Sequence, residues 1–311
     1  MKRIILVVIV LLCLSNNYFA QSGYDSTKVL INGSTFISKK DSGIVLDSTV
    51  NLMPKWHEFI SNIPSDYSRY FKLTFQADKI PLYMTVAATT AALWATDSKT
   101  WHESDKLFKT NKFIHNFSDI ITQFGDGSSQ FGLAAVFGIY GLAFSDAKAV
   151  RTGSQIVEAV LASGALVQVF KHITGRQSPS SSSMPGGSWT FFPNQITYAH
   201  KTSEYDAYPS GHVTTTLATV LVAAENYPDV WWIRPRGYTI TGCLAFGMVN
   251  YGIHWYSDYP LAIVFGYTFG MLAAHPDVIP NSIAGNKLKG NFTIMPILTD
   301  KGFGLGAGYS F

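Results

Sequence analysis

Charged residues are scarce in this chain of 311 residues. Asp, Glu, Lys and Arg make up 14% of it and hydrophobic residues 47%, whereas an ordinary soluble domain has about 25% charged residues. Such a composition favours a large core, a membrane-facing surface, or both. The formal charge is +3, and Lys2 and Arg3 supply two of these charges within a segment that we expect to be removed. With so small a basic surplus left, the composition gives no reason to expect nucleic-acid binding.

Cysteine is almost absent, which excludes a disulfide framework. Cys13 lies inside an N-terminal leader, and Cys243, in an apolar segment, is then left as a core thiol. Residues 1–20 have the order of a secretory signal peptide: two basic residues, an apolar run from Ile4 to Leu14, and a cleavage site near Ala20. The run is short for a membrane span, so we expect cleavage rather than an uncleaved anchor helix. The protein should therefore be exported to the periplasm or cell-envelope membrane of a bacterium.

Metal-ligand spacing is also missing. His102 and His115 lie in a polar connection and form no spaced set with other His, Cys or acidic residues. We therefore expect no metal and no other cofactor.

Six apolar segments rich in Ala, Gly and Thr indicate helices in close contact. Most of them are shorter than the ~20 residues that a perpendicular membrane span needs. We therefore expect a compact all-α bundle whose helices are apolar because they are buried, and the alternative is a membrane-embedded bundle. The segments are 82–95, 131–144, 156–170, 213–224, 240–252 and 261–274.

The composition divides the chain into four parts. Residues 1–20 form the signal peptide, 21–55 a polar N-terminal arm, 56–276 the helical domain, and 277–311 a tail. In the tail, Asn291 to Leu298 and the alternating stretch after Gly302 predict a short β-hairpin.

Pro209-Ser210-Gly211-His212 comes directly before an apolar run that begins at Val213. The first amides of a helix have no intrahelical acceptor and lie at the positive end of the helix dipole, so a helix that starts here offers an oxyanion site. Gly211 permits close approach of the backbone, Ser210 adds a hydroxyl donor, and His212 can exchange a proton.

A second imidazole, His254, precedes a carboxylate, Asp258, by four residues. We expect Ser257 to cap the last helix, so that Asp258 lies in its first turn beside His254. Between the apolar segments, the stretch from Ser178 to Gly187 must be a loop. Together with its continuation, Trp189 to Tyr198, this loop forms either a lid or one wall of the substrate pocket, or a flexible connector.

Three motifs in this order resemble the type 2 phosphatidic acid phosphatase superfamily, which includes bacterial acid phosphatases and vanadium haloperoxidases. The family pattern is Lys-x6-Arg-Pro, Pro-Ser-Gly-His and Ser-Arg-x5-His-x3-Asp. This chain has Lys171 with Pro179, the complete middle motif, and His254 with Asp258. The two motif arginines are replaced, by Ser178 and Met248. The resemblance spans roughly residues 80 to 275 and implies a helical bundle of the phosphatidic acid phosphatase/haloperoxidase type.

The resemblance also implies a role for each residue of the site. His254 would attack phosphorus, Asp258 would hold its other ring nitrogen, and His212 would protonate the leaving group and then activate water. Lys171, Ser210 and the Gly211 amide would bind the phosphoryl oxygens. Arg176, two residues before the expected place, could replace a missing arginine.

Three functions remain open at this point. The first is an exported phosphomonoesterase acting through a phosphohistidine on a phosphorylated small molecule, a lipid phosphate or a pyrophosphate. The second is a non-catalytic relative that binds a phosphorylated or lipid ligand. The third is a vanadate-dependent haloperoxidase, which needs a more cationic site, so the lost arginines count most against it.

Overall fold

The computed structural model describes residues 30–31, 34–35, 53–276, 291–299 and 302–310. The expected signal peptide, residues 1–20, lies outside this set, as do most of the arm 21–55 and residues 277–290 of the tail. The described part of the chain from residue 53 to 276 is all-α. The expected all-α class is confirmed.

Each of the six apolar segments forms a long helix, and each helix begins at least two residues before the apolar run. Polar residues such as Lys148 and Arg234 therefore lie inside helices whose predicted start, taken from the apolar run alone, is later in the sequence. The six helices are α4 (Ile80–Trp94), α7 (Gly127–Phe144), α8 (Ala147–Thr174), α10 (Gly211–Asn226), α11 (Ile233–Asn250) and α12 (Tyr259–Ala274).

Shorter helices connect the long ones. The polar stretch between α4 and α7 is itself helical, as α5 and α6, and Asn111 caps α6 by accepting hydrogen bonds from two backbone amides of its first turn. The shorter α-helices are α2 (Glu58–Ser61), α3 (Ile63–Thr74), α5 (Asp97–Thr110), α6 (Lys112–Gln123) and α9 (Gln195–His200). The 3₁₀ helices are η1 (Ala77–Lys79), η2 (Pro179–Ser181), η3 (Thr202–Glu204) and η4 (Tyr256–Asp258).

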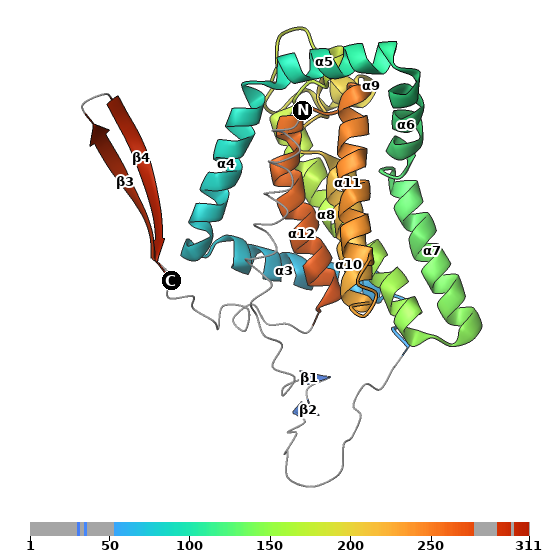
Figure 1. Cartoon of the computed structure of the whole chain (residues 1–311). Helices are drawn as coiled ribbons and strands as arrows, with labels where there is room; N and C mark the ends of the chain where they lie inside the picture. Colours follow the sequence, from blue (N-terminus) through green and yellow to red (C-terminus); the bar gives the residue numbers. More distant parts are fainter. Residues whose placement is uncertain (1–29, 32–33, 36–52, 277–290, 300–301, 311) are drawn as a thin grey trace.

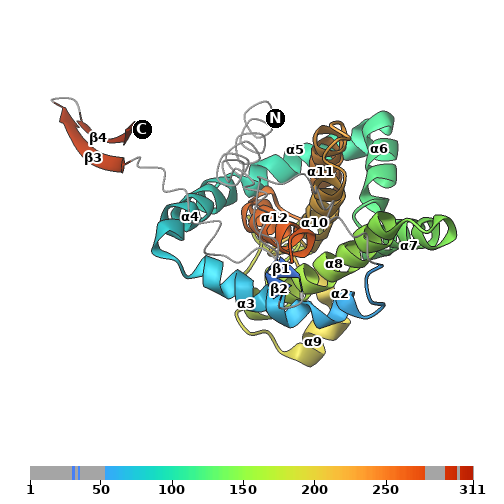
Figure 2. The same cartoon turned by 90° about the horizontal axis from the view of Figure 1, so that it is seen from below.

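Helix α10 lies at the centre of the bundle and packs on α8, α11 and α12. In Figure 1, α10, α11 and α12 run side by side, with α5 across one end of the bundle and α3 across the other. Figure 2, seen along the bundle, shows α3, α4 and α7 on the outside of this group. The site described below lies at the α5 end, where α10 begins.

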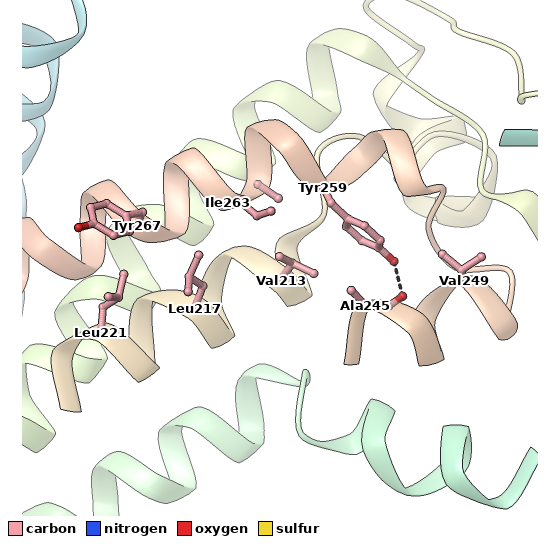
Figure 3. Close-up of a cluster of buried hydrophobic side chains, with 9 residues drawn as sticks. Val213, Leu217, Leu221, Ala245, Val249, Tyr259, Ile263 and Tyr267 are labelled. Carbon is pink, nitrogen blue, oxygen red and sulfur yellow. Dashed lines mark hydrogen bonds between the residues drawn. The ribbon is translucent and has the colours of Figure 1, made fainter. Parts of the chain in front are cut away.

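The core between α10, α11 and α12 consists of aliphatic and tyrosine side chains (Figure 3). Leu217 and Leu221 of α10 are fully buried there against Ile263 of α12. Tyr259 is buried as well, and its hydroxyl donates to the Ala245 carbonyl at 2.6 Å, which satisfies the polar end of the ring.

Small residues allow α12 to approach α10 closely. A Cβ atom added to Gly266 would lie 2.5 Å from the Thr214 carbonyl oxygen, and one added to Gly270 would lie 2.9 Å from that of Ala218. Since both neighbours are backbone atoms, these positions leave no room for a side chain. The Gly-rich composition of the apolar segments therefore has the packing role expected of it.

Burial does not explain why α4 and α7 are apolar, so that part of the sequence interpretation was wrong. The buried residues are only Val86 in α4, and Gln130, Ala134 and Gly141 in α7. Ile139 and Leu142 of α7 are each 69% exposed. Among the described residues, α7 and α8 are long and apolar enough to cross a membrane, but half of the apolar window of α8 is buried in the bundle.

The described part of the tail is an antiparallel hairpin. Strand β3 (Asn291–Thr299) pairs with β4 (Gly302–Ser310), in a register that runs from Asn291 opposite Ser310 to Thr299 opposite Gly302. A second, smaller pair consists of β1 (Leu30–Ile31) and β2 (Ser34–Thr35).

Candidate active site

The site is built around the first turn of α10. Ser210 is the N-cap residue of this helix, and its hydroxyl accepts a hydrogen bond from the Val213 amide. A Cβ atom on Gly211 would lie 3.9 Å from the Lys171 ammonium nitrogen, so the lysine at the end of α8 reaches the start of α10. The positive end of the helix dipole and the lysine therefore point into the same space.

Two histidines face each other at this point. His212 Nδ1 lies 3.1 Å from His254 Nε2, and the other nitrogen of His254, Nδ1, lies 2.8 Å from the Ala207 carbonyl oxygen. A carbonyl oxygen can only accept, so His254 carries its proton on Nδ1 and has a lone pair on Nε2. His212 must then donate its Nδ1 proton to that lone pair in the resting site.

Burial controls the protonation of both rings. Burial, with Lys171 nearby, lowers the pKa of His254 to about 3. Burial also lowers the pKa of His212 to about 3, helped by His254 and Lys171. Both rings are therefore neutral at pH 7, so Nε2 of His254 is unprotonated and can act as a nucleophile once a ligand displaces the hydrogen bond from His212.

Asp258 lies next to His254 but does not form the expected short hydrogen bond. Its Oδ2 is 3.5 Å from His254 Nδ1 and instead accepts the Trp255 amide at 2.7 Å. The Ala207 carbonyl is the hydrogen-bond partner of the imidazole. Asp258 is thus a charge beside the ring, and burial raises the pKa of its carboxyl to about 6.

Arg176 does not line the cavity, which corrects its proposed role as a substitute anion ligand. Gly175 ends α8 with a left-handed backbone (φ +51°), and the Arg176 side chain that follows is fully buried. Its guanidinium pairs with Asp97 at 2.8 Å and with Asp258 at 2.5 Å. It also donates to the Ser257 hydroxyl and the Gly186 carbonyl. None of these partners lines the cavity.

Ser257 does not cap the last helix either. Its hydroxyl and amide hydrogen-bond to Asp97, and the 3₁₀ helix η4 precedes α12. Asp97, at the start of α5, is fully buried, and burial raises the pKa of its carboxyl to about 6. The Asp97–Arg176–Asp258 cluster connects α5, the end of α8 and the start of α12.

A cavity of about 210 Å³ opens in front of the two histidines. Lys171 forms an ion pair there with Asp206. Ser178, which replaces a motif arginine in the resemblance, contributes to the wall, whereas Met248, which replaces the other, is buried beside Gly125. The lining residues are Lys171, Ser178, Ser180, Thr202, Ser203, Asp206, His212, Ile253 and His254.

The structure brings Lys171, Ser210, Gly211, His212, His254 and Asp258 together and separates Arg176 from the cavity. Sequence reasoning missed the Ala207 carbonyl, Asp97 and Asp206. Ala207 and Asp206 lie two and three residues before the middle motif, which begins at Pro209, so their position was a signal. Backbone acceptors and ion pairs, however, have no residue pattern. Nothing in the sequence around Asp97 marked it. Among the described residues, no group of three His, Cys, Asp or Glu could hold a metal ion.

An all-α bundle that gathers two histidines, a lysine and a helix N-terminus at one cavity has the components of a histidine-based phosphoryl-transfer site. The family profile described as PAP2 superfamily matches residues 153–276, which supports a relationship to the type 2 phosphatidic acid phosphatase superfamily. This match supports phosphoric ester hydrolysis as the general class of activity. Comparisons with curated proteins and with solved structures gave no match.

Proposed function

We propose that this protein is an exported phosphomonoesterase, with lipid phosphates among its substrates, and that it acts through a phosphohistidine on His254. The observation that carries the proposal is the pairing of His254 Nε2 with His212 Nδ1, 3.1 Å apart, at the mouth of the cavity. A phosphoryl group that enters between the rings would have a nucleophile on one side and a proton donor on the other.

The nucleophile is the Nε2 lone pair of His254. The hydrogen bond from Nδ1 to the Ala207 carbonyl fixes both the tautomer and the direction of the ring. Once Nε2 bonds to phosphorus, the ring becomes cationic, and the Asp258 carboxylate at 3.5 Å from Nδ1 stabilises that charge. Arg176 holds Asp258 in place and is a positioning residue in this mechanism.

The general acid is His212. A bound phosphoryl anion raises the affinity of this ring for a proton, and Asp126, 3.7 Å from Nε2, acts in the same direction. The imidazolium gives its Nδ1 proton to the leaving alkoxide. The neutral ring then takes a proton from water, whose oxygen attacks phosphorus and releases His254.

The phosphoryl oxygens are bound by Lys171, the Ser210 hydroxyl and the Gly211 amide. The start of α10 adds the positive end of its dipole, and the lysine lies within reach of that first turn. The mechanism uses no metal, so we expect turnover to continue in EDTA.

A lipid substrate is supported by the outer faces of α4 and α7. Met84 is 66% exposed and Phe144 is 71% exposed, on helices with few charges. Large exposed apolar surfaces of this kind mark contact with membranes or partners. We propose that the protein associates with a membrane of the cell envelope.

The experiment measures phosphate release from 4-nitrophenyl phosphate and phosphatidic acid by the full chain in detergent. Wild type is compared with His254→Ala and with a matched control, His102→Ala, whose histidine is exposed on α5. Loss of a nucleophile should reduce kcat by at least about 10³-fold, and the control should keep wild-type activity. Turnover that survives His254→Ala would contradict the proposal.

A further inference from the structure

The cavity carries little net positive charge for a phosphate site. Its charged lining residues, among those that the structure describes, are Lys171 and Asp206, and these two form an ion pair with each other. The walls are therefore close to neutral. A doubly charged phosphate monoester would have to compete with Asp206 for the lysine.

The charged groups around the cavity do not add net positive charge to it. Arg176 is shared by two carboxylates, those of Asp97 and Asp258. The carboxylate of Asp126 lies 3.7 Å from His212 Nε2. The surroundings thus contain more carboxylates than basic side chains, and each additional negative charge on a ligand is disfavoured.

Hydroxyl groups line the part of the cavity that lacks cations. Ser178 and Ser180 come from the loop after α8, and Thr202 and Ser203 from η3. Hydroxyls donate hydrogen bonds to phosphoryl oxygens but bring no charge. They suit an ester whose phosphoryl group is polar but only singly charged.

We propose that the site prefers phosphoryl groups with a single negative charge, and that phosphate diesters are therefore a substrate class of this protein in addition to monoesters. The inference rests on the histidine chemistry of the proposed function. A diester keeps one ionised oxygen at all pH values of interest, whereas a monoester becomes a dianion above its second pKa of about 6.

The reaction of a diester uses the same two histidines. Nε2 of His254 bonds to phosphorus while one P–O ester bond breaks, and the leaving alkoxide takes the Nδ1 proton of the His212 imidazolium. Water then gives a proton to His212 Nδ1 and its oxygen to phosphorus, and the P–N bond breaks. The net change is one water consumed, one alcohol released and one phosphate monoester formed.

The test compares kcat/KM for bis(4-nitrophenyl) phosphate and 4-nitrophenyl phosphate at pH 8, with the full chain in detergent. The diester-to-monoester ratio is compared between wild type and Ser178→Arg, so that the intrinsic reactivities of the two esters cancel. Ser183→Arg places the same charge on an exposed position of the same loop that does not line the cavity, and serves as the matched control.

We expect Ser178→Arg to lower the ratio about 10- to 100-fold, as one added charge near the phosphoryl group would at an effective dielectric constant of about 20. Ser183→Arg should leave it unchanged. If Ser178→Arg does not fold, Asp206→Asn is used, which frees Lys171 and should lower the ratio in the same direction. An unchanged ratio in a folded Ser178→Arg or Asp206→Asn protein overturns the inference.

Failure of the proposed function gives a different result, because wild type would then hydrolyse neither ester. The charge preference is in that case measured by calorimetric titration with inorganic phosphate and with dimethyl phosphate at pH 8. Tighter binding of dimethyl phosphate supports the inference, and tighter binding of inorganic phosphate overturns it.

Discussion

At the scale of single residues, Arg176 changes role between sequence and structure. Its position near the first motif indicates an anion ligand, yet its guanidinium is fully buried between Asp97 and Asp258. The sequence could not show this role, because Asp97, which pairs with Arg176, is 79 positions away along the chain. In the proposed mechanism the arginine acts through Asp258, not on substrate.

Replacing Arg176 should therefore destabilise the fold. Arg176→Met leaves two buried carboxylates without their cation, and we expect a loss of about 3–5 kcal/mol in the free energy of unfolding. Arg236→Met, at an exposed arginine that lies over the Trp232 ring, is the control and should cost less than about 1 kcal/mol. Denaturant unfolding followed by circular dichroism measures both. A stable Arg176→Met protein with only a raised KM would restore the direct role in anion binding.

The neutral state of His254 should make stability depend on pH. Its pKa is about 3 in the folded protein and about 6.5 in the unfolded chain. A lowered folded-state pKa gives stability that is complete above pH 6.5 and is lost as the pH falls towards 3. Between pH 7 and pH 4 this single group should cost wild type about 3 kcal/mol.

His254→Gln removes the titrating group but keeps a polar side chain. When the pH falls from 7 to 4, the free energy of unfolding of wild type should therefore decrease by about 3 kcal/mol more than that of the variant. His102→Gln, at an exposed histidine of α5, is the control. Parallel stability curves for wild type and His254→Gln would mean that His254 is not held neutral by the fold.

At the scale of elements, the contact between α10 and α12 places the groups of the candidate site, because α10 begins at Gly211 and α12 follows Asp258. Gly266→Ala should separate these helices, since its Cβ would lie 2.5 Å from the Thr214 carbonyl. We expect a loss of about 1–3 kcal/mol in stability. Gly242→Ala, inside α11 with no atom within 4 Å of the new Cβ, should be neutral or slightly stabilising. Equal melting temperatures for the two variants would contradict this packing.

The elements show what sequence could and could not predict. Apolar segments predicted every long helix, and Pro209 to His212 predicted the start of α10 and the histidine at its first turn. Apolar runs did not predict the helices α5 and α6, because both are amphipathic and carry their apolar residues among polar ones. It also did not reveal that the Ala207 carbonyl, rather than Asp258, bonds to His254, since backbone acceptors have no residue identity.

At the scale of the whole molecule, the apolar outer face of α7 should govern membrane association. Ile139→Lys with Leu142→Lys places two charges on residues that are each 69% exposed. We expect a several-fold loss of binding to phosphatidylglycerol vesicles, with unchanged turnover of 4-nitrophenyl phosphate. Gln123→Lys, at an exposed polar position of α6, is the control. If the double lysine variant still binds vesicles, the outer face of α7 does not contact the membrane and would serve another partner.

The central claim is that His254 becomes covalently phosphorylated. The direct measurement is to mix the full chain with substrate, quench in alkali, which preserves phosphohistidine, and map the modified peptide by mass spectrometry. The account predicts a phosphoryl group on His254, lost on treatment with acid and absent from His254→Ala. A protein that turns over substrate while His254 stays unmodified, or that carries the phosphoryl group on another residue, would contradict it.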